Sequence, residues 1–152
     1  MKVRDILARK QKPAYSVLPT DTLTTLSKYL RDRRIGAVVV STDGRTIEGV
    51  ISERDIAHKL CLHDANFGAI TVAELMTRAV ITCRLNDPVA HVATTMSAHN
   101  IRHVPVIDDE GLHAGMVSIR DVLNLRVDEL QREAALLRTM SAQPGQPGQR
   151  HE

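Results

Sequence analysis

The sequence is poor in aromatic residues, with one Phe, two Tyr and no Trp among its 152 residues. Its core must therefore be built from Val, Ile, Leu, Ala and Met. Protein surfaces that bind single-stranded nucleic acid stack its bases on aromatic side chains, and the formal net charge here is only +2. Both features argue against a nucleic-acid-binding protein.

Long apolar runs and a set of paired cysteines are also absent. No run approaches the ~18 apolar residues of a membrane span, and residues 1–5 lack the apolar core of a signal peptide. Cys61 and Cys83 stand in unlike contexts and do not indicate a disulfide framework. We therefore expect a cytoplasmic protein without a membrane partner.

One heptapeptide occurs twice in the chain. Residues 49–55 (GVISERD) return 66 positions later as residues 115–121 (GMVSIRD). Sliding residues 15–60 onto residues 81–126 needs no gap and gives nine identities, and four of them (Gly, Ser, Arg and Asp) fall inside the heptapeptide. The chain therefore contains an internal duplication.

The same order of elements is predicted in both copies from apolar periodicity and turn residues. The first copy has an extended piece at 15–17, a helix from Asp21, strands at 35–40 and 47–51, and a helix at 54–60. The second has an extended piece at 80–82, a helix at 87–99, strands at 102–107 and 114–117, and a helix from Ser118. Short helical segments at 3–8 and 72–77, 69 positions apart, precede the two copies. The predicted fold class is α+β, with two β-α-β-β-α units.

These units suggest boundaries along the chain. We expect repeat 1 at residues 1–70, repeat 2 at 71–126, a helical extension at 127–140 and a disordered, Gln-, Pro- and Gly-rich tail at 141–152. The extension continues an apolar seam at alternating four- and three-residue steps, typical of a coiled coil. This seam either packs on its own domain or forms a homodimer contact; its residues are Leu123, Val127, Leu130, Ala134 and Leu137.

The duplicated turn has two interpretations. Ser followed three residues later by Asp caps a helix, because the hydroxyl accepts from an early N–H and the carboxylate lies at the positive end of the helix dipole. The same groups can bind a nucleotide, with the N–H groups and Ser on phosphate and the carboxylate on a ribose diol. Arg54 and Arg120 would add cations for phosphate. Capping alone does not require the repeated Arg.

Residues 101–106 (IRHVPV), together with the two Gly-h-h-Ser-x-x-Asp turns (h, apolar), carry a family resemblance. The chain resembles a tandem pair of cystathionine-β-synthase (CBS) domains, a Bateman module, over about residues 1–130. The resemblance implies two repeats related by pseudo-two-fold symmetry, with their sheets packed together and helices outside. It also implies an adenosine ligand between the repeats (AMP, ADP, ATP, NAD or S-adenosylmethionine) and a role as an energy sensor or regulatory subunit.

The resemblance also assigns site residues. Asp55 and Asp121 would bind ribose, and Ser52 and Ser118 phosphate or ribose. The adenine would lie against one of two strand segments, and an extended residue would line each pocket. These segments and residues are Ile35, Gly36, Ala37 and Val38 with Ser16 in one copy, and Ile101, Arg102, His103, Val104 and Pro105 with Thr82 in the other. The strands differ between the copies, so the two sites should be unequal. We expect the second site, with Asp121, to bind the ligand in preference to the first, with Asp55.

Other chemistry has little support in the sequence. His99 and His103 are four residues apart, but a strand should begin between them, which breaks the helical spacing of a metal pair. No nucleophile-His-carboxylate pattern or Gly-x-Ser-x-Gly turn is present, and neither is a Gly-rich phosphate loop. We expect no enzyme activity, no metal and no catalytic cofactor.

Two functions remain. The first is a stand-alone regulatory module that binds an adenosine compound and signals to an unknown protein target, as a homodimer. The second is a ligand-independent dimerisation module with vestigial pockets.

Overall fold

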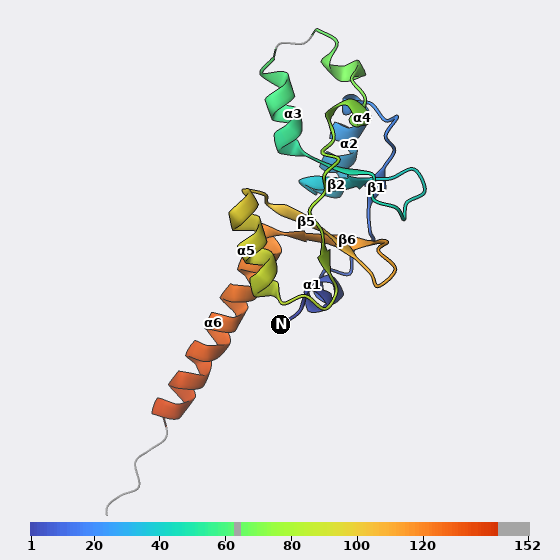
Figure 1. Ribbon diagram of the computed structural model, residues 1–152. Helices are drawn as coiled ribbons and strands as arrows, with labels where there is room; N and C mark the ends of the chain where they lie inside the picture. Colours follow the sequence, from blue (N-terminus) through green and yellow to red (C-terminus); the bar gives the residue numbers. More distant parts are fainter. Residues whose placement is uncertain (63–64, 143–152) are drawn as a thin grey trace, which may run out of the picture.

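The computed structural model describes residues 1–62 and 65–142 and contains two three-stranded sheets (Figure 1). In each sheet the middle strand pairs in parallel with the strand that precedes it and antiparallel with the strand that follows. Val17 lies opposite Val40 in the first sheet, and Cys83 opposite Val106 at the equivalent place in the second. The strands are β1 (Ser16–Val17), β2 (Ala37–Val40), β3 (Gly49–Ser52), β4 (Cys83–Arg84), β5 (His103–Ile107) and β6 (His113–Ser118).

The helices complete two β-α-β-β-α units and confirm the predicted α+β class. They are α1 (Val3–Lys10), α2 (Leu23–Arg33), α3 (Glu53–Leu60), α4 (Val72–Leu75), α5 (Val89–His99) and α6 (Ile119–Ser141), with a short 3-10 helix, η1 (Phe67–Ala69). α2 and α5 follow the first strand of each sheet, and α3 and α6 follow the last, as the repeated pattern predicts.

Several predicted boundaries were wrong by a few residues. The extended piece expected at 80–82 lies further on, at Cys83–Arg84, because these are the residues that pair with β5. The helix expected from Asp21 begins at Leu23, since the Thr22 side chain accepts the Thr25 N–H and caps the helix. The helix expected from residue 87 begins at Val89, after Pro88 at its N-cap.

The two hydrophobic cores do not follow the order of the chain. Val3 and Ile6 of α1 are buried among residues of the second repeat. Val72 and Met76, at α4, are buried among residues of the first. Each repeat is therefore completed by the short helix that stands in sequence before the other repeat.

α6 is the longest helix, with 23 residues, and extends away from the two sheets (Figure 1). Of its residues only Leu125 is buried, while Leu123, Val127, Leu130 and Leu137 are exposed. Most of the tail predicted to be disordered, from residue 143, lies outside the described residues. Within the described ranges, no helix combines the length and apolarity needed to cross a membrane.

Candidate functional site

Both duplicated turns form capped helix starts. We call Ser52, Arg54 and Asp55 the first clamp, and Ser118, Arg120 and Asp121 the second clamp. In each, the carboxylate Oδ2 accepts the Ser backbone N–H at 2.8 Å, and the Ser hydroxyl accepts the Asp N–H. Ser and Asp therefore cap the helix that follows in both copies, as one of the two interpretations predicted.

The first clamp opens onto a large cavity between the repeats, with a volume of about 360 Å³. Ser52, Arg54 and Asp55 line one side of this cavity. The strand of the other repeat lines the opposite side, with Ile101, Arg102, His103 and Pro105. Small-molecule sites in proteins are typically clefts of ~300–1,000 Å³, so this cavity has the size of a ligand site. It lies between the first clamp of one repeat and the strand segment at residues 101–105 of the other.

Arg54 also connects the two repeats directly. Its guanidinium donates to the carbonyl oxygen of Asn100, the C-cap residue of α5, at 3.3 Å. The carboxylate of Asp55 receives the N–H and the hydroxyl of Ser52 on the same oxygen, Oδ2. Within the part of the chain that the structure describes, Asp55 makes no ion pair. The first clamp therefore presents a carboxylate that has no ion-pair partner among the described residues.

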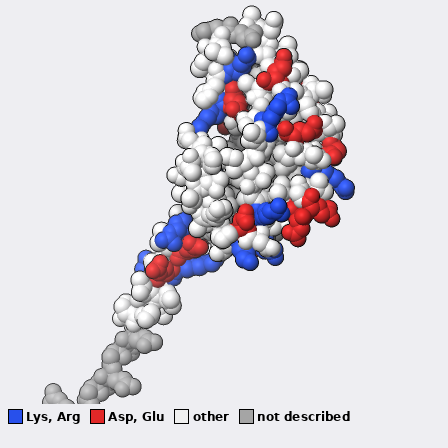
Figure 2. All heavy atoms as spheres, in the orientation of Figure 1, with Lys and Arg blue, Asp and Glu red and all other residues white. Residues whose placement is uncertain are grey.

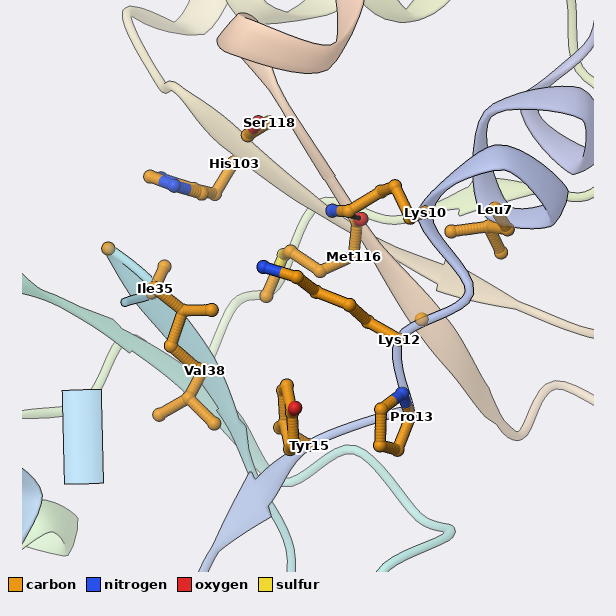
Figure 3. A pocket seen from close by; sticks show the side chains of 13 residues that line it. Leu7, Lys10, Lys12, Pro13, Tyr15, Ile35, Val38, His103, Met116 and Ser118 are labelled. Carbon is orange, nitrogen blue, oxygen red and sulfur yellow. Dashed lines mark hydrogen bonds between the residues drawn. The ribbon is translucent and has the colours of Figure 1, made fainter. Parts of the chain in front are cut away.

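A second, smaller cavity of about 90 Å³ also has His103 in its wall (Figure 3). Here Ser118 of the second repeat faces Ile35 and Val38 of the first. Its other walls come from α1, the segment that follows it and β6. The side chains of Lys10 and Lys12 extend into the cavity (Figure 3). At this volume it is well below the size of a typical small-molecule site.

Lys10 neutralises the second clamp. Its Nζ lies 2.9 Å from Asp121 Oδ2 and donates to the Met116 carbonyl oxygen, also at 2.9 Å. The side chains of Lys10 and Asp121 are only 24% and 14% exposed, so water screens this ion pair less than one at the surface. The geometry therefore favours the first clamp as a ligand site, the opposite of the order expected from the strand sequences.

The predicted site residues divide into three groups. Ser52, Arg54, Asp55, Gly36, Ala37, Ile101, Arg102, His103 and Pro105 line the large cavity. Ile35, Gly36, Ala37, Val38, His103 and Ser118 line the small cavity, and Asp121 contacts its wall through Lys10. Ser16, Thr82, Val104 and Arg120 line neither: Val104 is fully buried in the second core, and Thr82 and Arg120 are exposed.

Sequence reasoning missed the segments that close both cavities. Thr77, Ala79, Val80 and Ile81 line the large cavity, where Thr77 pairs with Val50 beside β3. Lys10 and Lys12 line the small one. The 69-residue spacing between the short helices was a usable signal, because continuing it past these helices places residues 77–81 in register with residues 8–12.

His103 forms part of the wall of both cavities. A Cβ atom on Gly36 would lie 3.2 Å from its ring, so the absence of a side chain at Gly36 leaves room for the imidazole. Burial lowers the pKa of His103, and the Lys10 charge lowers it further, while Asp121 acts in the opposite direction. The ring is therefore held neutral between the two cavities.

The charge distribution outside the cavities is mixed. On the face shown in Figure 2, Lys and Arg side chains lie beside Asp and Glu side chains over both repeats. No single-sign surface of the kind that binds a nucleic-acid backbone stands out on this face.

Comparison with known proteins agrees with this architecture. The family model described as "CBS domain" matches residues 3–61 and 72–128. The chain belongs to the CBS-domain family. Its two matches make it a CBS pair, as the sequence motifs predicted.

Curated CBS relatives occur in several settings. The chain is 33% identical over 117 residues to a mitochondrial CBS domain-containing protein of Arabidopsis thaliana, which covers 74% of this chain and 56% of the relative. It is 33% identical over 123 residues to the L-aspartate semialdehyde sulfurtransferase of Methanocaldococcus jannaschii, covering 81% of this chain but 23% of that enzyme. The chain thus spans from about a quarter to just over half the length of these relatives.

Solved CBS pairs have the same fold. A CBS-domain-containing protein from Agrobacterium tumefaciens matches with a TM-score of 0.77 and 30% identity, over 83% of this chain and 99% of that one. The CBS domain pair of protein MJ0100, in complex with 5′-methylthioadenosine and S-adenosylmethionine, gives 0.75 and 32%, over 85% and 98%. A CBS domain protein from Pyrobaculum aerophilum complexed with AMP gives 0.70 and 29%, over 80% and 89%.

Proposed function

We propose that this CBS pair is a regulatory module that binds an adenosine-containing ligand in the large cavity. The observation that carries the proposal is the juxtaposition, across that cavity, of the Ser52-Asp55 clamp and the strand segment Ile101–Pro105. Two CBS pairs of the same fold were solved with AMP or with 5′-methylthioadenosine and S-adenosylmethionine, which supports this class of ligand. The role proposed is regulatory, without catalysis.

In the proposed complex, Asp55 accepts hydrogen bonds from the ribose diol. Ser52 and Arg54 lie beside the phosphate or the equivalent 5′ group, and the adenine packs against residues 101–105. Such a ligand contacts both repeats at once. It can therefore change their relative orientation, by no more than its difference in affinity for the two arrangements. That change is the signal to a protein target.

Isothermal titration calorimetry against AMP, ADP, ATP, NAD and S-adenosylmethionine tests the proposal. We expect binding of at least one of them, and a loss of at least about tenfold in affinity for Asp55→Asn, because a hydrogen bond to a charged group contributes about 1.5–3 kcal/mol. Asn keeps the oxygen that accepts the Ser52 N–H, so the helix cap survives.

The matched control is Asp121→Asn, the same substitution in the second clamp. Its affinity should equal that of the unmodified chain. Absence of heat with all five compounds at millimolar concentration would end the proposal, and a larger effect of Asp121→Asn would move the site to the small cavity.

The exposed face of α6 favours a second function, assembly of two copies. Leu123, Val127, Leu130 and Leu137 are between 47% and 60% exposed at coiled-coil spacing. A homodimer that buries this seam is the proposed oligomer, and the purely structural version of the function has the dimer form without any ligand.

Sedimentation equilibrium with Leu130→Glu distinguishes these possibilities. A charge in the seam should shift the protein to a monomer, whereas Ala135→Glu, an apolar-to-charged change off the seam, should leave the dimer intact. An unmodified chain that stays monomeric at every protein concentration across the micromolar range would rule out assembly through α6.

A further inference from the structure

One pair of equivalent wall positions gives the two cavities different charges. Leu7 lies against Gly115, and Met76, 69 positions after Leu7, lies against Gly49 in the same manner. This repeated contact aligns the two closing segments residue by residue. In that alignment Lys10 of the small cavity corresponds to Ala79 of the large cavity.

Lys10 is held in place over the second clamp. It is the last residue of α1, and Val3 and Ile6 anchor that helix in the second core. From this position its ammonium group contacts both Asp121 and the Met116 carbonyl oxygen at 2.9 Å. Figure 3 shows the side chain extended along the cavity towards His103 and Ser118. Ala79, at the equivalent place, has neither the charge nor the length to contact Asp55.

Competition for the carboxylate follows from this difference. A ribose diol offers the carboxylate neutral hydroxyl donors, whereas Lys10 offers a full positive charge, so its hydrogen bond to Asp121 is also a partly buried ion pair. Lys10 is also part of the chain, so its pairing with Asp121 needs no binding of a free molecule. The lysine stem additionally fills space in a cavity of only 90 Å³.

We propose that Lys10 determines which cavity of this CBS pair binds a nucleotide, because its ammonium group occupies the second clamp as an internal cation. The small cavity then rejects ribose-bearing ligands, and the module binds one nucleotide, at the first clamp. This inference rests on the proposed nucleotide function and adds which clamp is closed and by which residue.

A reciprocal exchange between the two copies tests it. Calorimetry is performed on the whole chain with AMP and with S-adenosylmethionine as separate probes. We expect one bound probe per unmodified chain, two per Lys10→Ala chain and none per Ala79→Lys chain, because the introduced lysine would pair with Asp55. The double variant Lys10→Ala/Ala79→Lys should bind one probe again, now at the second clamp.

Three variants serve as controls. Lys12→Ala removes the same charge from the same cavity but not from Asp121, and Lys10→Arg keeps a cation at that carboxylate, so both should bind one probe. Ala79→Met puts a long side chain without a charge into the wall of the large cavity and so measures the steric part of the loss, and Ala79→Lys should lose more binding than Ala79→Met. Circular dichroism melting curves confirm that each variant is folded, and the Ala79 pair carries the test if Lys10→Ala does not fold.

Failure of this inference differs from failure of the proposed function. Two probes per unmodified chain, or one probe on both the unmodified chain and Lys10→Ala, would overturn the role of Lys10 while leaving nucleotide binding intact. Equal loss in Ala79→Met and Ala79→Lys would also overturn it. No probe on the unmodified chain but one on Lys10→Ala would support the role of Lys10 and refute binding at the first clamp. No probe on either would refute both.

Discussion

His113 ties the two repeats together through its side chain and its backbone. Its Nε2–H donates to the Tyr15 carbonyl oxygen at 3.0 Å, and its N–H donates to the Arg45 carbonyl oxygen at 2.8 Å. The other ring nitrogen, Nδ1, is buried without a hydrogen-bond partner among the described residues. Burial lowers the pKa of His113, although the bond to Tyr15 opposes this. The repeats are thus joined by an imidazole whose burial favours the neutral form.

Acidification should weaken the fold through this group. An unfolded histidine titrates near about 6.5, so the unfolded chain takes up protons first as the pH falls below that value. Stability should therefore decrease from about pH 6.5 downwards until the lower pKa of the folded state has been passed. His113→Gln should flatten this part of a urea-denaturation profile, with a remaining slope from His103, whose pKa is also lowered.

The control is His91→Gln, a substitution at an exposed histidine of α5. It should leave the pH dependence of the free energy of unfolding as it is in the unmodified chain. Equal slopes for His113→Gln and the unmodified chain would show that the ring is not titrating at the junction of the repeats.

The two cysteines should differ in reactivity because only one of them is buried. Cys83 is buried, and burial together with the charge of Asp87 raises its pKa to about 12, whereas Cys61 is exposed. Because the thiolate is the reactive form, we expect Ellman's reagent to modify one thiol in the native protein and the second only in denaturant. Cys61→Ser should abolish the fast reaction. Fast modification of two thiols would mean that the second core opens readily.

The short N-terminal helix is the element whose role the structure changes most. α1 contributes Val3 and Ile6 to the core of the second repeat, with exposures of 0% and 3%. The sequence predicted the helix but placed it with repeat 1, which follows it directly. A periodicity identifies the apolar face of a helix, whereas the partner of that face is set by the path of the chain in space.

Removal of one side chain tests this placement. Ile6→Ala should lower the free energy of unfolding by about 2–5 kcal/mol, the range for losing a large aliphatic side chain from a core. Leu136→Ala, at an exposed position of α6, removes a comparable side chain and should cost much less. Chemical denaturation measures both, and a cost for Ile6→Ala no larger than that of the control would indicate that α1 is frayed in solution.

In the whole molecule, each half of the chain contributes a helix to the hydrophobic core of the other half. α1 completes the second core and α4 the first, and the clamp of one repeat faces the strand of the other across each cavity. The repeats therefore depend on each other for both stability and ligand contacts, and we expect a single cooperative unfolding transition.

Two fragments of nearly equal length test this dependence. Residues 1–70 follow the boundary predicted from the sequence but lack Val72 and Met76 of the first core. Residues 11–78 include both and omit α1. We expect a cooperative thermal transition, followed by circular dichroism, for residues 11–78 but not for residues 1–70. The reverse result would support the sequence-based boundary at residue 70, which is so far a prediction.

The amino-acid sequence alone determined the duplication, the order of elements, and the Ser and Asp residues of both clamps. These features are local: a cap needs residues three apart, and a strand needs a short apolar run. The duplicated turn also pointed to adenosine ligands through a family resemblance. The family and the fold were predicted correctly on this basis.

Only the tertiary structure decided how the clamps are used. The pseudo-two-fold arrangement places each clamp against a strand about 50 to 80 residues away along the chain, and no periodicity reports contacts at that separation. It also brings Lys10 to Asp121, 111 residues later, while Ala79 stands at the equivalent place in the other copy and Asp55 makes no ion pair within the described residues. Identical clamp residues thus acquire different electrostatic surroundings, because a carboxylate's availability depends on its neighbours in space.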